Sequence, residues 1–244
     1  GGGGGEAGSP SKEKLEVSVQ DWDDDCMDEK TSYLAKCLEL NLPPKSSVIT
    51  RRTADGFAMP NHGTGDRNMK ALARGIRLMS NLQVVNLSDN RITGSGCESL
   101  VKAIKGNVDV QQILLASNQI GRVGCASLER CLPSLPSLVL LDLSHNKLSD
   151  SDTKVLMNAL PECLALKQVN LSHNFISSTG AEDIGEGLNR CQSLSKLDLS
   201  WNAVRGKGAA SIGESLRSNR TLLDLNLAWN GVGGGGGLGS APLV

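Results

Sequence analysis

Leu-Ser-His-Asn at residues 143–146 occurs again at residues 171–174, 28 positions further along the chain. Near-copies occur at the same step: LSDN at 87–90, LASN at 115–118, LSWN at 199–202 and LAWN at 227–230. The closing asparagines are Asn90, Asn118, Asn146, Asn174, Asn202 and Asn230. A constant period of about 20–50 residues is typical of stacked structural units, not of a single core folded once.

The apolar residues of each unit predict a short strand followed by a helix. A leucine lies three residues before every asparagine and a Val, Ile or Leu lies five before, which is the spacing of one strand face. In the first five units a Leu or Ile lies 10 and 14 residues after the asparagine, which is the spacing of one helix face. Six residues after the asparagine the chain has Gly96, Gly124, Gly180 and Gly208, with Asp152 as the exception.

Stacking these units predicts a curved α/β solenoid. Parallel strands lie about 4.8 Å apart, whereas packed helices need about 8–10 Å, so the sheet should form the inner, concave wall and the helices the outer one. The side-chain amide of each asparagine can satisfy backbone groups at its turn. We therefore expect the six asparagines to form a structural ladder along the stack.

These positions resemble the leucine-rich repeat family, and in particular its ribonuclease-inhibitor-like subfamily with 28-residue units. The shared pattern, L-x-x-L-x-L-x-x-N-x-I-x-x-x-G-x-x-x-L-x-x-x-L, covers residues 82–232. The resemblance implies a horseshoe that binds another protein. The subfamily includes inhibitors, Ran GTPase-activating proteins, the sensor ends of innate immune receptors, and axonemal or ciliary scaffolds.

Four segments are expected along the chain. Residues 1–24 are expected to form a disordered Gly/Ser/acidic segment. Within the acidic stretch, Asp21 to Asp25 match a calcium loop only in part. Residues 25–52 are expected to form a helix and linker that could cap the repeats. Residues 53–232 form the repeat domain, with one degenerate, five full and one truncated unit, and residues 233–244 form a disordered Gly-rich tail. Because the last unit lacks its helix, we expect the chain end to expose Ile212, Leu216, Leu225 and Leu227 until further sequence or another chain covers them.

Composition narrows the class of partner. The formal net charge is -1, so no basic face for nucleic acid or an anionic membrane is expected. No apolar run approaches the roughly 20 residues that span a bilayer. The seven cysteines are odd in number and form no C-x-x-C pair, which favours reduced, buried thiols and a cytoplasmic location.

The predicted binding surface is the concave face. The residues immediately before the asparagines are Asp89, Ser117, His145, His173, Trp201 and Trp229, so two of the three tryptophans fall in one column. Exposed tryptophan is enriched in binding hot spots. We expect His145, His173, Trp201 and Trp229, with Asp142, Asn170 and Asp198 beside them, to contact a protein partner. The alternative is that the rings lie flat on the ascending loops and pack on Phe175 and Arg205.

No catalytic motif is present, so the chain is not expected to be an enzyme. His145 and His173 should lie on neighbouring strands, but no third ligand is at hand, and neither a metal nor a cofactor is expected. The favoured function is a non-catalytic scaffold for protein–protein interaction, cytoskeletal or ciliary by resemblance. The alternatives are a GTPase-activating regulator of a Ran-type small GTPase and an immune-sensor fragment, which would need a nucleotide-binding domain elsewhere.

Overall fold

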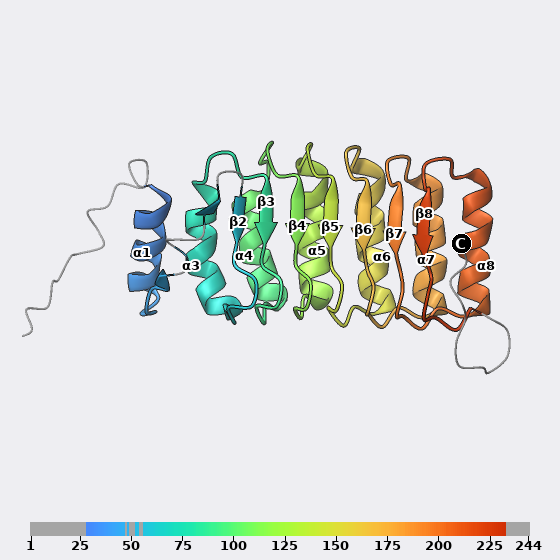
Figure 1. The fold of residues 1–244 in the computed structure, drawn as a ribbon, viewed down its shortest axis with the longest axis horizontal. Helices are drawn as coiled ribbons and strands as arrows, with labels where there is room; N and C mark the ends of the chain where they lie inside the picture. The colour runs from blue at the N-terminus through green and yellow to red at the C-terminus, as the bar shows by residue number, and fades with distance from the viewer. Residues whose placement is uncertain (1–27, 47, 49–51, 54–55, 233–244) are drawn as a thin grey trace, which may run out of the picture.

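The computed structural model describes residues 28–46, 48, 52–53 and 56–232. Within this part the chain is an α/β solenoid, with one sheet covered on one side by a layer of helices (Figure 1). The fold class predicted from the repeat is therefore confirmed. The terminal segments predicted to be disordered, and the calcium-loop-like stretch, lie outside the described residues.

The sheet has eight strands in chain order, and their short length follows from the short apolar alternation in each repeat. They are β1 (Arg52–Thr53), β2 (Gly56–Ala58), β3 (Val84–Asn86), β4 (Gln112–Leu114), β5 (Leu140–Asp142), β6 (Gln168–Asn170), β7 (Lys196–Asp198) and β8 (Asp224–Asn226). From β2 to β8 every pair is parallel, whereas β1 is antiparallel to β2. Paired residues such as Val85 and Ile113 are 28 positions apart, so the sequence period is also the register of the sheet.

The helices lie side by side behind the sheet (Figure 1). They are α1 (Glu29–Glu39), α3 (Gly65–Arg77), α4 (Gly94–Ile104), α5 (Gly121–Cys131), α6 (Asp150–Ala159), α7 (Ser178–Arg190) and α8 (Gly206–Ser218). Short 3-10 turns, η3 (Leu132–Ser134) and η4 (Leu160–Glu162), extend α5 and α6. Each contains a proline, which cannot donate to a continuing helix.

One continuous core lies between the two layers. The middle residue of each strand from β3 to β7 is buried and its neighbours are less so, which is the expected alternation of a strand, whereas in β2 both Gly56 and Phe57 are buried. From Leu87 to Leu199, the leucine three before each asparagine is fully buried. The end residues of each strand therefore point away from the helices, onto a surface that we call the sheet face.

The asparagines bond to the unit before their own. The Oδ1 atom of Asn118 accepts from the backbone N–H groups of Asn90 and Ile92, at 3.1 and 2.9 Å. Its Nδ2 donates to the carbonyl oxygen of Leu87 at 3.0 Å and to that of Leu115, in its own turn, at 2.9 Å. Asn174 repeats this arrangement one period later against residues 143–148. The turns are thus linked along the stack by buried side-chain amides.

The first helix packs on the next. Asp28 caps α1 by accepting from the Thr31 N–H at 2.7 Å. Tyr33 and Cys37 of α1 bury against Ala71 of α3, and β2 pairs with β3 in the register of the later strands. Helix α1 therefore covers the side of α3 that no repeat helix covers.

One packing prediction at the last repeat is wrong. Ile212 is buried, at 1% exposure, because it packs in the continuous core of the repeats. Leu216, Leu225 and Leu227 are partly buried against the same core. The six cysteines among the described residues are all buried and free, while Cys26 lies outside them.

Candidate protein-interaction face

An unusual backbone conformation occurs immediately before each asparagine. All six residues of this column have a left-handed φ between 51° and 57°: Asp89, Ser117, His145, His173, Trp201 and Trp229. This region suits glycine, asparagine or aspartate and disfavours bulky side chains. The turn that ends every strand therefore turns one side chain outward from the same point of each repeat, and in four successive repeats that side chain is a large ring.

The four rings form one continuous stack. Ring centroids lie 3.9 Å apart between His145 and His173, 5.0 Å between His173 and Trp201, and 4.5 Å between Trp201 and Trp229. The interplanar angles are 13°, 12° and 17° in the same order. These separations match the spacing of about 4.8 Å between parallel strands, so in-register pairing brings the rings into contact.

The stack remains open to solvent at its tryptophan end. Trp201 is 46% exposed and Trp229 is 61% exposed. The ring contacts found among the described residues run from ring to ring along the column, and Phe175, 66% exposed, is not among them. The rings therefore pack on one another, which is a different arrangement from packing on Phe175 and Arg205.

Stacking also changes the acidity of one imidazole. Partial burial lowers the pKa of His173 below its usual 6.5, and the neighbouring His145 lowers it further, while the Asp198 carboxylate opposes both effects. A lowered pKa favours the neutral ring at physiological pH. The neutral form of His173 continues the uncharged ring surface of Trp201.

A second column lies beside the stack, at the last residue of each strand. The Oδ1 atom of Asp142 accepts from the Ser144 N–H at 2.9 Å, and that of Asp198 accepts from the Ser200 N–H at 2.8 Å. Asn170 repeats the contact with Ser172 at 3.0 Å. These bonds to the backbone two residues on fix the side chains in place on the sheet face.

The same residues line a hollow of about 190 Å³ on β4 to β7. Its lining is Leu114, Leu140, Asp142, Gln168, Val169, Asn170, Lys196 and Asp198. Three of these, Asp142, Asn170 and Asp198, were predicted as contact residues. The other outward-facing positions of the lining were missed, although the two-residue strand period places Leu140, Gln168 and Lys196 on the same face as the predicted column.

The charge of the hollow is negative on balance. Lys196 is its one cation, and its Nζ lies 2.7 Å from Oδ2 of Asp224 in an ion pair. Oδ2 of Asp198 accepts from the Asn226 side-chain amide at 3.1 Å, and its charge contributes to the raised pKa of Lys196 without a direct ion pair among the described residues. The hollow thus combines apolar walls from Leu114 and Leu140 with two carboxylates.

Other kinds of site find no support in the described residues. Within this part of the chain no three His, Cys, Asp or Glu side chains come together in a way that could hold a metal ion. None of the helices described is long and apolar enough to cross a bilayer. The side chains that stand out on the sheet face of the described part are rings, amides and carboxylates.

Comparison with known proteins identifies the repeat. A family model described as "Leucine Rich repeat" matches residues 79–101, 134–157, 163–185, 190–213 and 218–239. The unit around β4 and α5 falls between these matches, although it continues the sheet in register. A search of curated proteins gives no match.

Solved structures with a similar outline exist at low identity. The structure titled "Leiomodin-1 Actin-Binding Site 2 (ABS2)" has a TM-score of 0.49 and 19% identity, over 54% of this chain and 76% of its own. A tropomodulin C-terminal domain from Caenorhabditis elegans has a TM-score of 0.47 and 12% identity, over 57% of this chain and 82% of its own. Likenesses of this degree carry no information on what the present chain binds.

Proposed function

Because this chain is a leucine-rich repeat protein, we propose that it is a non-catalytic scaffold that binds a partner protein on its sheet face. The observation that carries the proposal is the stack of His145, His173, Trp201 and Trp229, which is continuous over four repeats and open to solvent. The binding surface extends from this stack to the hollow beside it.

Stability alone does not account for tryptophan at these positions. Each stacked aromatic pair contributes about 0.5–1.5 kcal/mol beyond area burial. A left-handed φ costs a bulky residue about 1–2 kcal/mol, which offsets that gain. Asp89 and Ser117 show that small polar residues fill the same turn in the first two full repeats. The large exposed rings are better explained by contact with another molecule, in which tryptophan contributes strongly.

The hollow indicates the chemistry of the partner. A volume of about 190 Å³ with apolar walls accommodates one long side chain. Asp142 and Asp198 lie at its polar side, and its only cation, Lys196, is paired with Asp224. A lysine or arginine from the partner would place its apolar stem against Leu140 and its cationic head between the two carboxylates.

The test is quantitative affinity capture with three purified forms of the chain. Each form is coupled to beads, and the proteins that it captures are measured by mass spectrometry. The three forms are the wild type, the double variant Trp201→Ala/Trp229→Ala and the control Leu164→Ala/Phe175→Ala. The control removes two exposed apolar side chains outside the stack. We expect at least one protein to be retained by the wild type and the control but reduced about tenfold or more on the double tryptophan variant, as expected for loss of a hot spot.

A reciprocal experiment then tests the hollow. The captured protein, once identified, is titrated against Asp142→Asn/Asp198→Asn, which keeps the side-chain size and the ability to accept from the backbone. We expect weaker binding whose salt dependence is reduced relative to the wild type. Equal capture by all three bead-bound forms, with circular dichroism showing that each is folded, would refute the proposal.

The remaining sequence-based alternatives gain no support. No observation on the described residues favours GTPase activation, an immune-sensor role, or a cytoskeletal or ciliary setting. The cytoplasmic location stays a prediction from the cysteine pattern. Identification of the captured partner would decide the setting directly.

A further inference from the structure

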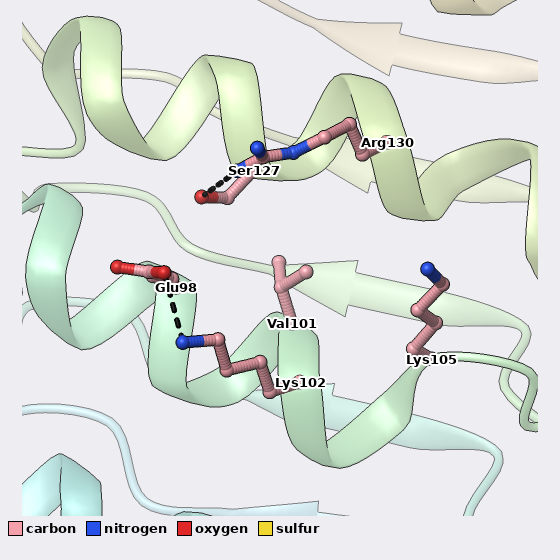
Figure 2. Close-up of a pocket in the computed structure, with 6 residues that line it drawn as sticks. All are labelled: Glu98, Val101, Lys102, Lys105, Ser127 and Arg130. Atoms are coloured by element: carbon pink, nitrogen blue, oxygen red, sulfur yellow. Dashed lines mark hydrogen bonds and ion pairs between the residues drawn. The ribbon is translucent and has the colours of Figure 1, made fainter.

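A hollow of about 300 Å³ lies between α4 and α5 on the helix layer, away from the sheet face (Figure 2). Its lining is Glu98, Val101, Lys102, Lys105, Ser127 and Arg130. Figure 2 shows the first four on α4 and its C-terminal end, and Ser127 and Arg130 on α5 across from them. Neither the predicted binding residues nor the proposed partner contact involves this groove.

Two of the three cations in the groove have no carboxylate partner. Lys102 pairs with Glu98, with Nζ and Oε1 2.9 Å apart. Arg130 forms no direct ion pair among the described residues: it donates to the Ser127 hydroxyl oxygen at 3.5 Å, and its charge reaches Glu98 only as a minor contribution to the lowered pKa of that carboxyl. The backbone N–H of Lys105 donates to the Val101 carbonyl oxygen at 3.0 Å, but its side chain takes part in no ion pair or hydrogen bond found among the described residues. After the one internal pair is taken into account, the groove has an excess of two positive charges.

The floor of the groove positions one of these cations. Ser127 is 1% exposed, and its hydroxyl donates to the Val123 carbonyl oxygen at 3.0 Å. Its oxygen is therefore oriented to accept from Arg130, and this contact uses one nitrogen of the guanidinium. Val101, which is also buried, supplies an apolar wall between Lys102 and Lys105 (Figure 2).

The surrounding helices reinforce the positive potential. Helices α3, α4 and α5, together with Lys105 at the end of α4, contain eight Lys or Arg and three Asp or Glu. Helices α6, α7 and α8 contain four Lys or Arg and six Asp or Glu. The whole chain has a net charge of -1, but the helix layer is basic over α3, α4 and α5 and acidic over α6, α7 and α8.

We propose that this groove binds a phosphorylated side chain of a partner protein. A phosphomonoester has a charge of about -1.5 to -2 at pH 7, which matches the excess charge of the groove. Arginine binds phosphate oxygens with its planar fork, and lysine adds a point charge from the opposite helix. Val101 provides an apolar surface for the carbon atoms that carry the phosphate.

A single carboxylate or a membrane fits less well. One carboxylate would leave one of the two excess charges unmatched. A flat lipid surface would contact the basic residues of α3, α4 and α5 together, whereas the hollow is lined by residues of α4, its C-terminal end and α5 alone (Figure 2). The groove is accordingly a site for one doubly charged group.

The test is fluorescence anisotropy with the full chain and a labelled peptide of glycine and alanine that contains one phosphoserine. The same peptide with serine, and with glutamate, is titrated in parallel. We expect saturable binding of the phosphopeptide, binding at least tenfold weaker for the serine and glutamate peptides, and a loss of at least tenfold in Lys105→Gln/Arg130→Gln.

A matched control removes the same charge outside the groove. Arg77→Gln/Arg122→Gln lowers the net charge by two in the same half of the helix layer, and neither residue lines the hollow. We expect this control to bind within about twofold of the wild type, with the same far-ultraviolet circular dichroism. Equal weakening by both double variants, equal binding of all three peptides, or binding of phosphoinositide vesicles without binding of the phosphopeptide would overturn the proposal.

Discussion

The indole rings of Trp201 and Trp229 stack with centroids 4.5 Å apart, although the two residues are 28 positions apart in the chain. Both hold a left-handed φ, at 55° and 57°. Two effects therefore meet at each residue, because stacking stabilises the rings and the backbone disfavours any bulky side chain at that φ. Their balance can be measured by substitution.

Replacing Trp201 by asparagine should cost less stability than replacing it by alanine. Both variants lose two stacking contacts, but asparagine tolerates a left-handed φ better than alanine does. We expect Trp201→Ala to lower the free energy of unfolding by about 1–2 kcal/mol and Trp201→Asn by about half of that. Urea denaturation of both proteins measures the difference, and identical losses would show that the backbone imposes no strain at this turn.

The regular part of the fold was predictable because period and register coincide. Each strand pairs with the next at the same phase, so the leucines that repeat every 28 residues, such as Leu143 and Leu171, meet in one core. The six asparagines have the same explanation, since each bonds to the unit before it. The predicted exposure of Ile212 failed, because this residue is buried at the same phase of the repeat as Leu156 and Ile184.

The surface was only partly predictable. The sequence places His145, His173, Trp201 and Trp229 in one column, but their stacking depends on a backbone φ that no leucine pattern reveals. The groove of the helix layer needs a small buried side chain, Ser127, on one helix and unpaired cations on two. Such combinations depend on how neighbouring helices approach each other.

The asparagine ladder should contribute much more than an exposed asparagine does. Asn146 is buried, its Oδ1 accepts from the Ile120 N–H at 3.2 Å, and its Nδ2 donates to the carbonyl oxygen of Leu115 at 2.9 Å. Asn146→Ala leaves these buried backbone groups without partners, so we expect a loss of about 3 kcal/mol in the free energy of unfolding. Asn158→Ala, on the exposed side of α6, should change it by less than about 0.5 kcal/mol. Guanidinium denaturation compares the two, and a small loss in Asn146→Ala would contradict a supporting role for the ladder.

The histidine end of the stack should make stability depend on pH. The pKa of His173 is lower in the folded chain than its usual 6.5, because burial and then His145 disfavour the charged ring. The unfolded chain therefore binds the proton first as pH falls. The stabilising contribution is fully present above pH 6.5 and is lost as pH falls through the lower, folded pKa.

This pH dependence can be assigned to one residue. We expect urea denaturation midpoints of the wild type to fall between about pH 7 and pH 5, and His173→Asn to show a smaller fall. Asparagine cannot titrate in this range and tolerates the left-handed φ of the turn. His62→Asn removes a histidine outside the stack and serves as the control. The assignment fails when His62→Asn reduces the pH dependence and His173→Asn does not.

Two glycines of α8 should respond to alanine in opposite directions. A Cβ atom on Gly208 would lie 2.7 Å from Cβ of Ala181 and 2.8 Å from the backbone of Ser178, so α8 would have to move away from α7. A Cβ on Gly213 would meet nothing within 4 Å. We expect Gly208→Ala to lower the free energy of unfolding by about 1–3 kcal/mol through overpacking, and Gly213→Ala to raise it by about 0.5–1 kcal/mol through helix propensity. Thermal unfolding measures both variants. If the helices approach closely at Gly208, the midpoint of Gly208→Ala falls below that of the wild type and the midpoint of Gly213→Ala rises above it. Equal shifts in one direction would mean that α7 and α8 do not touch at Gly208.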